Sequence, residues 1–207
     1  MMVKEQLFFP RLVCEDRRLP PFTPRNTPAQ QETALGAMHL KEGDVGFSVA
    51  SFRKALLNDP RLPDAHFGLG IATLKFSKGH PPAREDMEKR AMASFSMAIE
   101  LAGAQNASGP RPSLSTIIAY SHLMLALHSG GFDDFEGHVL AGMEACKGMG
   151  GFVGRAVMHS FGALGKEMHA RVAEQANNGE FAAMLSDARA HVDFLAIGME
   201  NAFAEGN

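Results

Sequence analysis

The sequence contains no tryptophan, one tyrosine and two cysteines, and its net charge is −3 at pH 7. The cysteines, Cys14 and Cys146, are far apart and form no metal-binding or redox motif, which favours a reducing setting. Since basic residues are not in excess, the charge balance gives no reason to expect nucleic acid as a partner. No apolar run is long enough for a membrane-spanning helix. We therefore expect a cytoplasmic protein that neither binds nucleic acid nor inserts into a membrane.

Motifs with known catalytic or metal chemistry are missing as well. The sequence has no Gly-rich phosphate loop, G-x-S-x-G motif, H-E-x-x-H motif or paired-cysteine motif. It has nine histidines, but no two are separated by two or four residues, so no local spacing indicates a metal site. We expect no enzyme, no bound metal and no cofactor. A metal-binding or hydrolytic helical protein is the least favoured alternative.

β-Branched residues are sparse, and Ala, Met, Leu and Gly dominate, which favours helix over sheet. Between about Ala29 and Gly103 one short pattern occurs twice, and its two Leu-Gly pairs are 34 residues apart. A period of 34 residues is typical of a helix–turn–helix repeat. The first copy consists of Leu35, Gly36, Ser48, Phe52, Ala55 and Pro60, and the second of Leu69, Gly70, Ala91, Phe95, Ala98 and Gly103.

This pattern resembles the tetratricopeptide repeat, which has Leu-Gly on its first helix and Ala-x3-Phe on its second. The resemblance implies an all-α helical repeat array, an α-solenoid. In such an array Gly36 and Gly70 would let two helices approach closely, and Phe52 and Phe95 would fill the space between them. Ser48 departs from the pattern, because the family usually has Ala there.

The chain divides into three parts. Residues 1–28 are rich in proline and are expected to be extended, either docked on the array or disordered. Residues 29–150 should hold two clear repeats and one degenerate repeat, with Thr27 capping a first helix that starts at Pro28. Residues 151–207 show two amphipathic stripes and should form a C-terminal helical hairpin that caps the array.

Two details of the repeats differ from the family pattern. Nine residues are inserted after Gly79, which should lengthen the following helix to about Pro82–Ala102 and add a solvated charged face. In the third pair, aligning the turn at Gly131 with that of the first repeat places Leu140 at the position of Phe52. This pair keeps the helix–turn–helix pattern without the signature residues.

By the resemblance, the first helices of the repeats line an apolar concave groove that binds a partner peptide or helix. This makes the protein an interaction adaptor or chaperone-like module, as in bacterial secretion chaperones built from similar repeats. A self-associating scaffold, a homodimer formed through the C-terminal helices, is the alternative. Phe67 and Ile71 belong to the groove or, equally, to the core. The predicted groove residues are Thr33, Ala37, Lys41, Phe67, Ile71, Lys75, Ser121, His122 and Leu125.

Overall fold

The computed structural model describes residues 27–166, except residue 110, residues 150–153 and residues 156, 160 and 163. All regular structure in this part of the chain is helical, which confirms the all-α prediction. Apart from Thr27 and Pro28, the proline-rich segment lies outside the described residues, as does the predicted hairpin beyond Lys166. The helices are α1 (Pro28–Glu42), α2 (Val45–Asn58), α3 (Pro63–Ser77), the 3-10 helix η1 (Pro81–Ala83), α4 (Arg84–Asn106), α5 (Pro112–Leu127) and α6 (Phe132–Met149).

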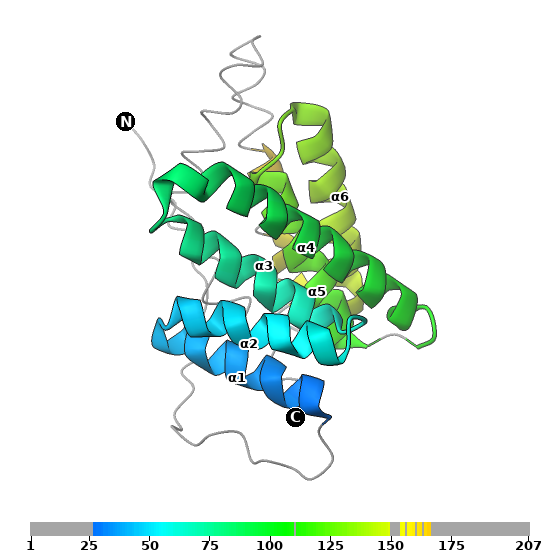
Figure 1. The fold of residues 1–207 in the computed structure, drawn as a ribbon. Helices are drawn as coiled ribbons and strands as arrows, with labels where there is room; N and C mark the ends of the chain where they lie inside the picture. Colours follow the sequence, from blue (N-terminus) through cyan, green and yellow to red (C-terminus); the bar gives the residue numbers. More distant parts are fainter. Residues whose placement is uncertain are drawn as a thin grey trace.

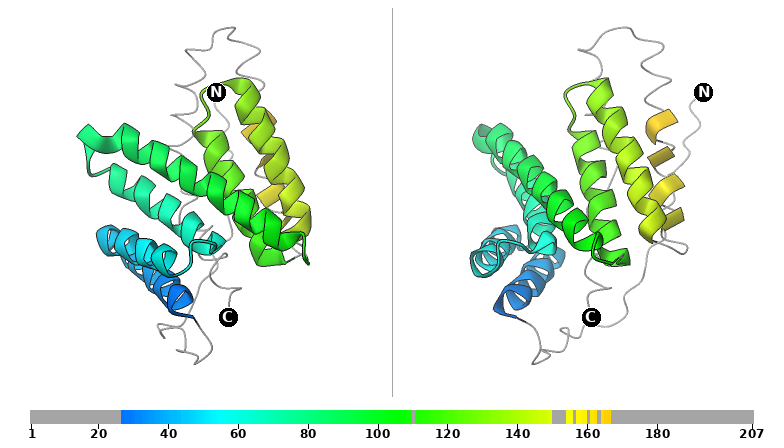
Figure 2. Two further views of the ribbon diagram at one scale, coloured as in Figure 1. Left: turned by 45° about the vertical axis from the view of Figure 1, so that its right-hand side comes forward. Right: turned by 90° about the vertical axis from the view of Figure 1, so that its right-hand side faces the viewer.

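The helices pack in consecutive pairs: α1 with α2, α3 with α4, and α5 with α6. Contacts of α2 with α3, and of α4 with α5, join each pair to the next, and Figures 1 and 2 show α3 and α4 between the other two pairs. In addition, α1 contacts α3 and α3 contacts α5, so the first helices of the three pairs are neighbours. Helical residues between 154 and 166 continue the packing on the far side of α6.

Local signals set both ends of the first helix, and its predicted start at Thr27 and Pro28 is confirmed. The backbone N–H of Thr27 donates to Gln30 Oε1 at 2.9 Å, and the N–H of Gln30 donates to Thr27 Oγ1 at 3.3 Å. This capping box satisfies two backbone donors that helix geometry leaves free, and Pro28 occupies the first helical position. At the other end Gly43 has φ 88°, a left-handed conformation that glycine adopts without strain.

The inserted segment before α4 differs in detail from the prediction. Pro82 lies in the 3-10 helix, and the α-helix begins two residues later at Arg84. The helix extends to Asn106, beyond its predicted end. Its first turns carry a solvated charged face, because three ion pairs of 2.7 Å join residues one turn apart, all of them exposed except the half-buried Glu88. These pairs are Arg84–Glu88, Glu85–Lys89 and Asp86–Arg90.

Phenylalanine rings seated on glycines hold the first two pairs together. Phe52 on α2 is fully buried, and its ring lies against Gly36 of α1 and Gly68 of α3. A Cβ atom added at Gly68 would come within 2.3 Å of Phe52 Cε1 and Cζ, so no larger residue fits there without displacing the ring. Phe95 on α4 is likewise buried against Gly70 of α3. Both glycines of the predicted pattern therefore allow the close approach expected of them.

Ser48, which departs from the family pattern, has a clear structural role. Its side chain is buried between α1 and α2, and its hydroxyl donates a 2.8 Å hydrogen bond to the backbone carbonyl of Gly36. A buried hydroxyl without such a partner would cost stability. The serine thus adds a polar link at the same close contact that the glycine makes possible.

The third pair does not follow the predicted alignment. Leu140, expected at the position of Phe52, is 60% exposed, whereas Phe135 and Val139 on the neighbouring face of α6 are buried. The helix itself runs through Lys147 and ends at Met149. The close glycine contact of α6 lies on the side facing residues 154–166, because a Cβ atom at Gly142 would come within 2.3 Å of the Phe161 ring.

The glycine seats can be tested by paired substitutions within helices. We expect Gly68→Ala to lower the free energy of unfolding by about 1–2 kcal/mol, because the clash with Phe52 outweighs the gain in helix propensity. Gly103→Ala on α4 is the matched control, since a Cβ atom there meets no other atom within 4 Å. It should raise the free energy of unfolding by about 0.5–1 kcal/mol. Urea unfolding measures both, and equal effects would contradict the packing described.

Candidate functional site

Four of the nine predicted groove residues are buried: Thr33, Phe67, Ile71 and Ser121. Phe67 and Ile71 are 1% and 2% exposed, and the Phe67 ring lies 6.0 Å from that of Phe95. Because α3 is packed against α1, α2, α4 and α5, its apolar side chains are enclosed on several sides. Phe67 and Ile71 therefore belong to the core, the alternative that the sequence left open.

The other five predicted groove residues keep accessible surface. Lys41, in the last turn of α1, is exposed, and Ala37, Lys75, His122 and Leu125 are half-buried. They lie on α1, α3 and α5, the three neighbouring first helices. With Phe67 and Ile71 in the core, the accessible surface of this layer is smaller and more polar than the groove predicted from the sequence.

An apolar surface that the repeat pattern did not predict lies on α2. Phe47 and Leu57 are 68% and 86% exposed, far more than core residues of the same type. With the exposed residues Ala50 and Lys54 they follow spacings of three, four and three residues, which place them along one side of a helix. We call Phe47, Ala50, Lys54 and Leu57 the α2 stripe. This spacing is visible in the sequence, but the repeat pattern concerns only the buried side of the same helix.

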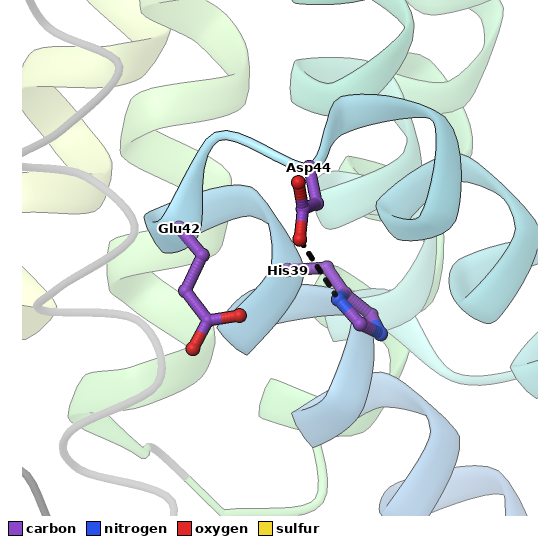
Figure 3. A group of neighbouring side chains, drawn as sticks. All are labelled: His39, Glu42 and Asp44. Atoms are coloured by element: carbon purple, nitrogen blue, oxygen red, sulfur yellow. Dashed lines mark ion pairs between the residues drawn. The ribbon is translucent and has the colours of Figure 1, made fainter.

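A group of three potential metal ligands, His39, Glu42 and Asp44, lies at the turn between α1 and α2 (Figure 3). Each offers one ligand atom, and these atoms lie within 4.8 Å of one another. His39 Nδ1 is 4.0 Å from Asp44 Oδ2, and the His39 ring lies 5.6 Å from that of Phe47. Both carboxylates are exposed to solvent, and all three residues come from one turn of chain. Exposed carboxylates remain hydrated, so the contact between these three side chains mainly closes the turn between α1 and α2.

A third group joins α5 to α6. His122 Nδ1 lies 3.1 Å from His138 Nδ1, and the ring centroids are 5.3 Å apart. Both side chains are half-buried. Burial, and less strongly the nearby His138, lower the pKa of His122 to about 4. Burial also lowers the pKa of His138, although the charge of Asp134 acts in the opposite direction. Both imidazoles are therefore neutral at physiological pH.

The sequence analysis did not predict the histidine pair, because it considered only metal ligands on neighbouring turns of one helix. A signal for it is nevertheless present in the predicted hairpin. His122 and His138 each lie eight residues from Gly130, and antiparallel helices joined at a short turn bring equidistant residues together. The sequence places His122 in the partner groove, whereas its closest polar contact in the structure is this second histidine.

The one cysteine in the described part of the chain is Cys146, which is 2% exposed. Burial raises its pKa to about 12, so the residue is a protonated thiol at neutral pH. None of the described helices is both long and apolar enough to span a bilayer. Comparison of the chain with protein-family models, curated proteins and solved structures gives no match.

The assignment of Phe67 to the core predicts how a charge affects it. Phe67→Glu should lower the free energy of unfolding by at least about 3 kcal/mol, because the ring is lost and a carboxylate is buried without a partner. Phe47→Glu is the control, since Phe47 is exposed and should tolerate the charge within about 0.5 kcal/mol. Chemical unfolding followed by circular dichroism measures both. A Phe67→Glu protein as stable as the wild type would contradict the assignment of Phe67 to the core.

The histidine pair predicts a dependence of stability on pH. An unfolded histidine has a pKa near 6.5, whereas that of His122 is about 4, so the unfolded state binds more protons between these values. The free energy of unfolding should therefore fall as the pH falls from 6.5 toward 4. His122→Gln should flatten this decline, because glutamine does not titrate. An unchanged slope in the variant would contradict the burial of a neutral imidazole at this position.

Proposed function

We propose that the protein is an interaction module, built from tetratricopeptide-like helical hairpins, that binds a helical segment of another protein. Three features support the tetratricopeptide-like assignment. The helices pack in consecutive pairs, the first helices of the pairs are neighbours, and Phe52 and Phe95 are seated on glycines at the positions expected from the repeat pattern. Adjacent helical hairpins of this kind offer extended surfaces for binding.

The observation that carries the proposal is the α2 stripe. Phe47 and Leu57 leave large apolar surfaces in water on a helix whose opposite side is fully buried. Burying one such side chain contributes about 1.5–3 kcal/mol, so covering both supplies a large part of the free energy of binding. The three-four-three spacing of the stripe matches the spacing at which two helices pack side by side. An amphipathic helix is therefore the occupant that fits.

Charge beside the stripe indicates which helix would bind. Between Val45 and Asn58, α2 carries two basic residues, Arg53 and Lys54, and no acidic residue. Lys54 forms an ion pair with Glu32 of α1, while Arg53 is exposed. A partner helix with acidic residues flanking its apolar side would complement this surface. Arg53 would then affect the association rate and the salt dependence more than the affinity.

The test compares the double variant Phe47→Glu/Leu57→Glu with the wild type in affinity purification from the native host, followed by binding measurements on the recovered protein. Both residues are exposed, so the variant should fold. We expect its affinity for the recovered partner to fall at least about 30-fold, the loss typical of a central interface residue. Leu140→Glu, on the exposed side of α6, is the matched control and should bind like the wild type.

Two outcomes would contradict the proposal. The first is equal binding of the partner by the wild type and the double variant. The second is a concentration-dependent mass of the wild type that the double variant loses, which would assign the α2 stripe to a homodimer. Light scattering on both proteins separates these cases.

A further inference from the structure

His122 and His138 meet in a geometry that suits more than a hydrogen bond between two rings. Their Nδ1 atoms are 3.1 Å apart, with the rings tilted by 43° to each other. In the ring-to-ring hydrogen bond, one Nδ1 carries a proton and donates it to the lone pair of the other. If both rings instead carry their proton on Nε2, the two Nδ1 lone pairs point into the same small space. Two lone pairs brought this close provide adjacent ligands for a cation.

The distance between the two nitrogens matches that between neighbouring ligands on a first-row metal ion. Histidine nitrogens lie about 2.0–2.1 Å from zinc, so at a tetrahedral angle two of them are about 3.3 Å apart. At a right angle the same bonds give about 2.9 Å, as in square-planar or octahedral sites. The observed 3.1 Å lies between these values. An ion can therefore bind both rings with little movement of α5 or α6.

We propose that His122 and His138 form a two-histidine clamp that binds a divalent transition metal ion, with Zn²⁺ as the natural example, through both Nδ1 atoms. Imidazole nitrogen is a preferred ligand of zinc, nickel and copper, and a poor ligand of magnesium or calcium. The site joins α5 to α6, so binding stabilises the third helical pair. This inference does not depend on the proposed partner binding, since none of its residues belongs to the α2 stripe.

A nearby negative charge also suits the clamp. Asp134 lies one helical turn before His138 on α6, and its charge acts on that ring. An exposed carboxylate at this position favours a cation at the two nitrogens, and water completes the coordination.

The group at the α1–α2 turn is the competing candidate and serves as an internal control. His39, Glu42 and Asp44 offer one nitrogen and two exposed carboxylates from a single turn. The clamp instead draws two nitrogens from two helices. The two sites share no residue, so single substitutions separate them.

The experiment titrates untagged full-length protein with Zn²⁺ and records heat of binding and thermal unfolding. The wild type should bind one ion per chain. At a free concentration about 100 times the Kd, its unfolding midpoint should rise by about 5–10 °C. His122→Gln and His138→Gln should each weaken zinc binding more than about 100-fold. Losing even a residue that only hydrogen-bonds to a metal ligand lowers metal affinity by about 10–100-fold. Their unfolding midpoints should then not respond to zinc.

Two control variants test whether zinc binds specifically at His122 and His138. His128→Gln changes another half-buried histidine near the end of α5, whose Nδ1 contacts the Met124 carbonyl, and should bind zinc like the wild type. His39→Gln should also bind normally. Zinc binding that is absent from the wild type, unaffected by His138→Gln or lost in His39→Gln would overturn the proposal.

A second variant gives a positive signal and covers the case in which glutamine disrupts folding. His138→Cys replaces one nitrogen ligand by a thiolate, so Co²⁺ should produce a sulfur-to-cobalt absorption band in the near ultraviolet that the wild type lacks. The buried thiol of Cys146 should not contribute to it. The absence of the band in a folded His138→Cys protein would overturn the proposal.

Discussion

The close packing of phenylalanine rings on glycine backbones is the contact on which the other helix positions depend. Phe52 occupies the space where α1, α2 and α3 meet, and it does so because Gly36 and Gly68 have no side chains. Phe95 and Gly70 repeat this arrangement where α4 meets α3. A ring against backbone excludes water over a large area, yet it tolerates no extra methyl group. The spacing between successive helices is therefore fixed at these contacts.

This packing decides which surfaces remain for function. Because α3 is enclosed by helices from all three pairs, Phe67 and Ile71 stabilise the fold and have little surface to offer a partner. Among the described helices, α2 packs against α1 and α3, and Phe47 and Leu57 stay exposed on its other side. Whether an apolar residue is buried or exposed thus depends on the number of helices around it. The proposed interaction surface therefore lies on the outside of the helical layer and not at its centre.

The third pair is held differently and carries different chemistry. Leu140 is exposed at the aligned position of Phe52, and the glycine contact of α6 lies on its opposite side, with Phe161. Between α5 and α6 lies the polar pair His122 and His138, kept neutral by burial. Two neutral imidazoles give little net stabilisation by themselves. A metal ion held between them would add the cohesion that the aromatic seats give the first two pairs.

The sequence by itself determined where the helices lie, because caps, prolines and hydrophobic spacing act over a few residues. Thr27 caps α1 as predicted, and the resemblance to the tetratricopeptide repeat correctly placed Phe52 between the helices. Only the tertiary structure decided that Phe67 is buried while Phe47 is exposed, since burial depends on helices distant in the chain. The same holds for the contact of the two histidines. Spacing along a single helix cannot reveal it, and the equal distance of the two residues from Gly130 gives a contact only when α5 and α6 pack against each other.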